Sequence, residues 1–163
     1  MEKLLIKVYK NRKLSLFLKI SCHVMSLIFV LALCGEAGAL IYRKEYMDCA
    51  LVLLSAFVGF VLVSLMRRLI NAPRPYELYT FYEEKPKERV GRSFPSRHVY
   101  SAFAIATLTF FVSNIIAVIL IALALAMCVC RVLLGIHFLR DVIAGALLGA
   151  AGGAIGIIII NFI

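Results

Sequence analysis

The sequence has too few charged residues for a soluble domain. Charged residues make up 17% of its 163 residues and hydrophobic residues 63%, and the mean hydropathy is +0.98. Soluble domains of ordinary composition are far less apolar. The composition therefore excludes a soluble fold and predicts a membrane protein.

The patterns of cysteine chemistry are also missing. The five cysteines form no CxxC pair and have no histidine at metal-ligand spacing; they are Cys22, Cys34, Cys49, Cys128 and Cys130. All lie in or beside apolar blocks, where cysteine usually packs as a small buried residue. We therefore expect neither disulfides nor a zinc site.

No signal peptide is evident, because the opening MEKLLIKVYKNRK carries five basic residues and no long apolar core. Residues 1–13 predict either a short amphipathic helix in the membrane interface or a solvated basic tail. The net charge is +9, but the basic residues lie between or at the ends of apolar blocks. They form no soluble basic face, so we expect anionic lipid headgroups as partners and no nucleic acid.

Long apolar blocks predict an all-α, multi-pass transmembrane bundle of about five spans. A span needs roughly 20 apolar residues, and the blocks 14–42, 49–66 and 142–163 each predict one. The block 99–135 would be about 55 Å long as one helix, so it must fold back. Its one polar interruption, Ser113-Asn114, predicts a hairpin turn. Residues 1–163 then form a single membrane-embedded domain.

Two features concern packing within the bilayer. Gly145, Gly149 and Gly153 are four residues apart and predict a ridge that another helix can approach closely. In the first span, Glu36 lies near one end and can reach the interface, so His23 is the residue expected to need a partner inside the bundle.

Polar residues gather at three places that the hairpin brings to one membrane face. These places hold Arg67 and Arg74; then Ser96, Arg97 and His98; then Arg131, His137 and Asp141. Taken singly, such residues are often ordinary positive-inside arginines or satisfied interior histidines. Ionisable groups at membrane depth are costly, however, and eight polar residues at one end predict a functional site.

These residue types suit a phosphate ligand. Arginine donates two parallel hydrogen bonds and stays charged, and Ser96 predicts a helix N-cap with backbone amides facing an anion. On a helical turn, Asp141 could bond one ring nitrogen of His137 and leave the other nucleophilic. His98 could donate the proton that the leaving oxygen needs.

The segments RRLINAPRP, PSRH and CRVLLGIHFLRD, within residues 67–141, resemble the three signature motifs of the type 2 phosphatidic acid phosphatase superfamily. The family patterns are K-x6-R-P, P-S-G-H and S-R-x5-H-x3-D, and the chain keeps their order and spacings. The resemblance implies a membrane lipid phosphatase that needs no metal and no cofactor. Three positions depart from the patterns, with Arg67 in place of lysine, Cys130 of serine and Arg97 of glycine.

The resemblance also implies roles for the site residues. His137 would attack phosphorus to form a phosphohistidine, Asp141 would orient it, and His98 would protonate the leaving oxygen. The residues expected to bind phosphate are Arg67, Arg74, Ser96 and Arg131, and Arg97 joins them because it adds a positive group beside His98.

The small size and few spans look similar to bacterial undecaprenyl pyrophosphate phosphatases, so a lipid pyrophosphate is the leading substrate hypothesis. The alternatives are a phosphatidic acid or phosphatidylglycerol phosphate monoesterase and, in another class, an inactive lipid-binding or transport membrane protein. Haloperoxidases share the motifs on a soluble scaffold, which is absent here.

We expect a cell membrane location with lipid phosphate, membrane lipids and a second copy of the chain as candidate partners. If the three motifs and the N-terminus share one membrane face, that face carries 15 Lys and Arg, whereas the opposite face carries only Arg43 and Lys44. By the positive-inside rule, the face with the motifs would be cytoplasmic. Several of those arginines belong to the candidate site, and the pyrophosphate phosphatases that the chain resembles work on the outer face. We favour the outer face.

Overall fold

The computed structural model describes residues 2–79 and 90–163, and these residues form helices and no β-strand. The elements are α1 (Glu2–Lys10), α2 (Arg12–Tyr42), α3 (Tyr46–Ile70), α4 (Pro75–Leu78), α5 (Arg97–Leu108), the 3-10 helix η1 (Thr109–Phe111), α6 (Asn114–Leu133) and α7 (Leu139–Phe162). The prediction of an all-α bundle is confirmed.

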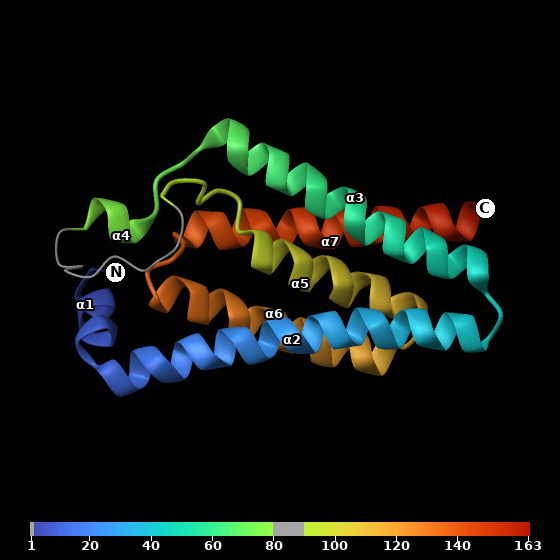
Figure 1. Cartoon of the computed structure of the whole chain (residues 1–163), viewed down its shortest axis with the longest axis horizontal. Helices are drawn as coiled ribbons and strands as arrows, with labels where there is room; N and C mark the ends of the chain where they lie inside the picture. The colour runs from blue at the N-terminus through green and yellow to red at the C-terminus, as the bar shows by residue number, and fades with distance from the viewer. Residues whose placement is uncertain (1, 80–89) are drawn as a thin grey trace.

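Four helices of the described residues, α2, α3, α6 and α7, are long and apolar enough to cross a membrane. The fifth predicted span is α5 continued by η1. Together they are about 24 Å long, shorter than the hydrocarbon layer. This short pass contacts α2, α3, α6 and α7, so it lies at the centre of the bundle (Figure 1).

The predicted hairpin is confirmed. The 3-10 helix ends at Phe111 and α6 begins at Asn114, with Ser113 as N-cap; its hydroxyl accepts a hydrogen bond from the Ile116 amide at 3.4 Å. As a result, the ends of α3 and α6 and the starts of α5 and α7 lie at the same end of the bundle (Figure 1). The N-terminus lies at this end and the C-terminus at the other.

The glycine ridge of α7 packs directly against α5. A Cβ on Gly145 would lie 2.6 Å from the backbone oxygen of Ser96, and one on Gly149 would overlap the backbone oxygen of Tyr100. On Gly153 it would lie 2.6 Å from Cβ of Thr107. The missing side chains let the two helices approach backbone to backbone, as predicted.

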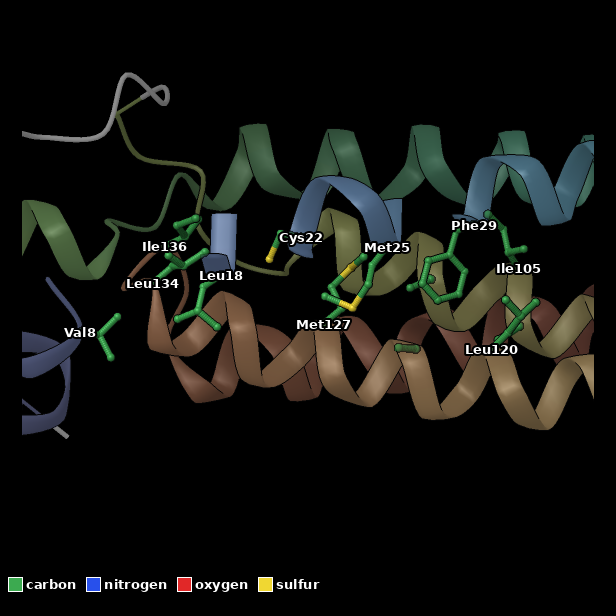
Figure 2. Close-up of a cluster of buried hydrophobic side chains, with 13 residues drawn as sticks. Val8, Leu18, Cys22, Met25, Phe29, Ile105, Leu120, Met127, Leu134 and Ile136 are labelled. Atoms are coloured by element: carbon green, nitrogen blue, oxygen red, sulfur yellow. The ribbon is translucent and has the colours of Figure 1, made fainter. Parts of the chain in front are cut away.

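A buried apolar cluster joins α1, α2, α5, α6 and the turn before α7 (Figure 2). It includes Val8 of α1 together with Leu134 and Ile136 of the turn. The N-terminal segment is therefore an amphipathic helix, with its apolar side packed on the protein: Leu5 and Val8 are 3% and 4% exposed. Its lysines are exposed.

Two expectations for α2 were wrong. His23 is exposed on the surface of the helix, whereas Glu36 is buried and accepts a hydrogen bond from the hydroxyl of Thr109 at 3.4 Å. Glu36 lies on the face of α2 that meets η1, so it cannot reach the interface.

All five cysteines lie in the described part of the chain and none forms a disulfide; Cys22 and Cys49 are buried as expected, but Cys34 is exposed.

We expect Gly149→Ala to lower the stability of the bundle. The added methyl group must push α5 away from α7, and overpacking of this kind typically costs about 1–3 kcal/mol. Gly38→Ala in α2 is the matched control, because a Cβ there meets nothing within 4 Å and alanine favours the helix. Thermal unfolding in detergent should show a lower midpoint for Gly149→Ala alone. Equal midpoints would mean that the ridge is not a tight contact.

Candidate active site

Two buried arginines hold the loop that leads into α5. Arg67, in the last turn of α3, donates from Nη1 to the backbone oxygens of Pro95 at 2.8 Å and Ser93 at 3.5 Å. Arg74, just before α4, donates from Nε to the backbone oxygen of Gly91 at 3.0 Å. A guanidinium carries five N–H donors, so one arginine can bond several acceptors at once.

The loop is also fixed on its other side. Gly91 has φ +69°, and a Cβ there would lie 2.6 Å from Oδ1 of Asn71. Its amide donates to Glu77 Oε1 at 2.6 Å, and the amide of Ser93 donates to the backbone oxygen of Ala72 at 2.9 Å. The loop therefore packs against the segment between α3 and α4.

The start of α5 contains three of the predicted residues. Ser96 is the N-cap, as predicted, although its hydroxyl makes no capping bond. Its amide donates to the backbone oxygen of Asp141 at 2.9 Å, so this amide does not face an anion as expected. Its Oγ is fully buried and has no hydrogen-bond partner among the described residues. Such a hydroxyl suits a polar ligand.

Arg97 and His98, in the first turn of α5, face a pocket between helices and not the loop that Arg67 and Arg74 hold. The guanidinium of Arg97 lies 5.0 Å from the ring centre of Phe60 in α3. His98 is exposed. Both residues line a pocket of about 250 Å³ between α2, α3, α5 and α6.

The end of α6 and the following turn place Arg131 beside His137. Arg131 is buried in the last turn of the helix. Gly135 then adopts φ +66°, and the amide of His137 donates to the backbone oxygen of Arg131 at 3.4 Å. The side chain of His137 is 2% exposed. Cys130, where the family pattern has serine, packs against the buried apolar cluster.

His137 and Asp141 do not share a helix turn as expected, because α7 begins only at Leu139. His137 Nδ1 lies 3.6 Å from Asp141 Oδ2, which is too long for a hydrogen bond. Oδ2 instead accepts hydrogen bonds from Ser93 Oγ at 2.5 Å and the Phe138 amide at 3.0 Å. Ser93 Oγ also lies 3.3 Å from Nδ1.

The structure brings the predicted residues together at one end of the bundle. The charges of Arg67, Arg97 and Arg131 are close enough to act on the His98 ring, and those of Arg67 and Arg74 on His137. Burial lowers the pKa of His137 below its usual value. The Asp141 carboxylate opposes this shift, whereas Arg74 and Arg67 add to it.

The sequence did not single out two residues of the site. Ser93 stands two positions before Pro95 and outside the family pattern, and Phe60 lies in a uniformly apolar span, so no local signal marked either one. Across residues 2–79 and 90–163, no three His, Cys, Asp or Glu side chains gather as a set of metal ligands.

The fold and the site define a multi-pass helical membrane protein with an arginine-rich, two-histidine site at one end. The chain belongs to the PAP2 superfamily, whose model matches residues 48–162. This is a family of lipid phosphatases, so the chain is a hydrolase that acts on phosphate esters.

Individual relatives support this membership. Decaprenylphosphoryl-5-phosphoribose phosphatase of Mycobacterium tuberculosis is 32% identical over 128 residues, which cover 77% of this chain and 67% of the relative. The crystal structure of Aquifex aeolicus LpxE has a TM-score of 0.72 and 29% identity, over 95% of this chain and 93% of that one.

A second crystal structure shows the same fold. It is the first transmembrane PAP2 type phosphatidylglycerolphosphate phosphatase from Bacillus subtilis, with a TM-score of 0.77 and 23% identity. The similarity covers 94% of this chain and 79% of that one.

We expect the ring of His137 to stay neutral as the pH falls through 6.5, the usual histidine pKa. Its pKa is lowered, so protonation should need a more acidic solution. A ¹⁵N NMR titration in detergent measures this, with the His137 signals identified by their loss in His137→Gln. A midpoint at or above 6.5 would contradict the expectation.

Proposed function

We propose that the chain hydrolyses a lipid pyrophosphate, similar to undecaprenyl pyrophosphate, through a phosphohistidine on His137 and without a metal. The observation that carries this proposal is the unequal setting of the two histidines around the arginines. His137 is buried beside Asp141, whereas His98 lines an apolar pocket. A nucleophile and a leaving-group acid need these different settings.

In the proposed reaction, Nε2 of His137 attacks phosphorus and the bond from phosphorus to the leaving oxygen breaks. Arg67, Arg74 and Arg131, with the hydroxyl of Ser96, stabilise the phosphoryl oxygens as their charge shifts. Arginine charge takes the part that a metal plays in other phosphatases.

His98 gives its proton to the leaving oxygen, and the adjacent phosphate anion favours the protonated ring. In the second half, His98 takes a proton from water, the water oxygen attacks phosphorus, and the bond from phosphorus to His137 breaks. Inorganic phosphate is then released and both histidines return to their starting states.

The pocket beside His98 supports a lipid leaving group. Apart from Arg97 and His98, its lining is mostly apolar, with Phe29 and Val30 of α2, Phe60 of α3, Ile105 of α5 and Met127 of α6. An apolar chain gains free energy by lying there. Arg97 is next to His98 and lines the same pocket, so in the proposed reaction it can contact a second phosphate attached to the lipid.

A phosphomonoester is the second candidate substrate. The relative that shares 32% identity is named for a phosphoribose carried on a decaprenylphosphoryl group, and that name favours a monoester.

We further propose that the chain is a single domain in the cell membrane with its site at the outer face. Several arginines that would otherwise place this face inside belong to the site, which weakens the charge argument.

The first test measures phosphate release by the purified protein in detergent with EDTA present, on lipid pyrophosphates and monophosphates. Wild type should hydrolyse the pyrophosphate best. His137→Ala should reduce turnover by orders of magnitude and His98→Ala nearly as much, while both variants keep their thermal midpoint. Wild-type turnover by His137→Ala would exclude the phosphohistidine. Activity that needs a divalent ion would exclude metal independence.

Arg97→Gly tests the choice between substrates. An arginine on the leaving-group side stabilises the charge that grows on a leaving phosphate, so its loss should slow pyrophosphate hydrolysis roughly tenfold to a hundredfold. Monophosphate hydrolysis should fall little. Arg68→Ala is the control, since Arg68 is exposed and does not line this pocket. Equal losses on both substrates would remove the main support for a pyrophosphate.

A further inference from the structure

The hydroxyl of Ser93 lies between the two residues that the family pattern pairs. Ser93 Oγ is 2.5 Å from Asp141 Oδ2 and 3.3 Å from His137 Nδ1, while the direct distance from Nδ1 to Oδ2 is 3.6 Å. All three side chains are buried. The contact between histidine and carboxylate therefore runs through a hydroxyl.

The direction of these hydrogen bonds follows from the chemistry of the groups. An ionised carboxylate only accepts hydrogen bonds, and a hydroxyl has a single proton to donate. The Ser93 proton therefore goes to Asp141, and Ser93 Oγ can interact with His137 only as an acceptor. The proton of the neutral ring must then be on Nδ1, which leaves the Nε2 lone pair available.

We propose that Ser93 is a positioning residue that fixes the Nδ1–H tautomer of His137 and transmits the charge of Asp141 to the ring. This inference rests on the proposed function, in which Nε2 is the nucleophile. When Nε2 bonds to phosphorus the ring becomes positively charged, and the Nδ1–H donated to Ser93 becomes more acidic. The Ser93–Asp141 hydrogen bond then stabilises the intermediate.

The backbone of Ser93 is held well enough for this role. Its amide donates to the backbone oxygen of Ala72 at 2.9 Å, and its carbonyl accepts from Arg67 at 3.5 Å. Arg67 also donates to the carbonyl of Pro95 at 2.8 Å. An arginine expected to bind the phosphoryl group thus also fixes the residue that orients the nucleophile.

The first experiment is ¹⁵N NMR of the histidine rings in the wild-type protein at a pH where His137 is neutral. The two nitrogens of a neutral imidazole have well separated shifts, so the tautomer can be read directly. We expect the proton of His137 on Nδ1. A proton on Nε2 would overturn the inference. This measurement needs no variant to fold and no substrate, so it stands even if every lipid phosphate fails as a substrate.

The second experiment compares Ser93→Ala with Ser93→Thr. Removing the hydroxyl should lower kcat about 10- to 100-fold with KM changed less than about threefold, because the hydrogen bond acts in the transition state and on a charged ring. His137 of Ser93→Ala should populate both tautomers. Ser93→Thr keeps a hydroxyl and should recover most of the activity and the Nδ1–H tautomer.

The double variant Ser93→Ala/Asp141→Asn tests whether Ser93 positions His137 through Asp141 or only stabilises the surrounding structure. If Ser93 acts through Asp141, the double variant should lose little more kcat than the worse single variant. Fully multiplicative losses, or wild-type kcat in a folded Ser93→Ala protein, would overturn the inference.

Discussion

The close packing of α7 on α5 is the constraint on which the rest of the site depends. Three glycines remove the side chains that would separate the helices, and the contact ends in the hydrogen bond from the Ser96 amide to the backbone oxygen of Asp141. This bond sets the two helix starts side by side. Ser96, the N-cap of α5, then lies beside Asp141 of α7, although more than 40 residues separate them in the chain.

The burial of three arginines is the second constraint on the site. Arg67, Arg74 and Arg131 are each at most 9% exposed, and desolvating a charge is costly unless it is compensated. Loop carbonyls are among the groups that compensate Arg67 and Arg74. Among the described residues the site combines three guanidinium groups with the one carboxylate of Asp141, and such a set of charges favours an anionic ligand.

The two histidines divide the site into two sides. His137 is buried on the side of Ser93 and Asp141, where its pKa is lowered. His98 faces the pocket that it shares with Arg97 and Phe60. In a phosphoryl transfer, the attacking and leaving groups must lie roughly in line on opposite sides of phosphorus. Arg97 and His98 line that pocket, so the proposed reaction would have the lipid leave on their side of phosphorus.

The sequence by itself determined the membrane class, the spans, the hairpin at Ser113, the glycine ridge and the group of polar residues at one end. Each depends on local composition or on a fixed spacing, which hydrophobicity and helix geometry translate directly. Only the tertiary structure decided that Glu36 is buried while His23 is exposed, and that Ser93 stands between His137 and Asp141. These outcomes depend on the rotation of α2 against its neighbours and on where a loop tied to Arg67 and Ala72 meets the start of α7. Contacts between distant segments set both, and no local pattern encodes them.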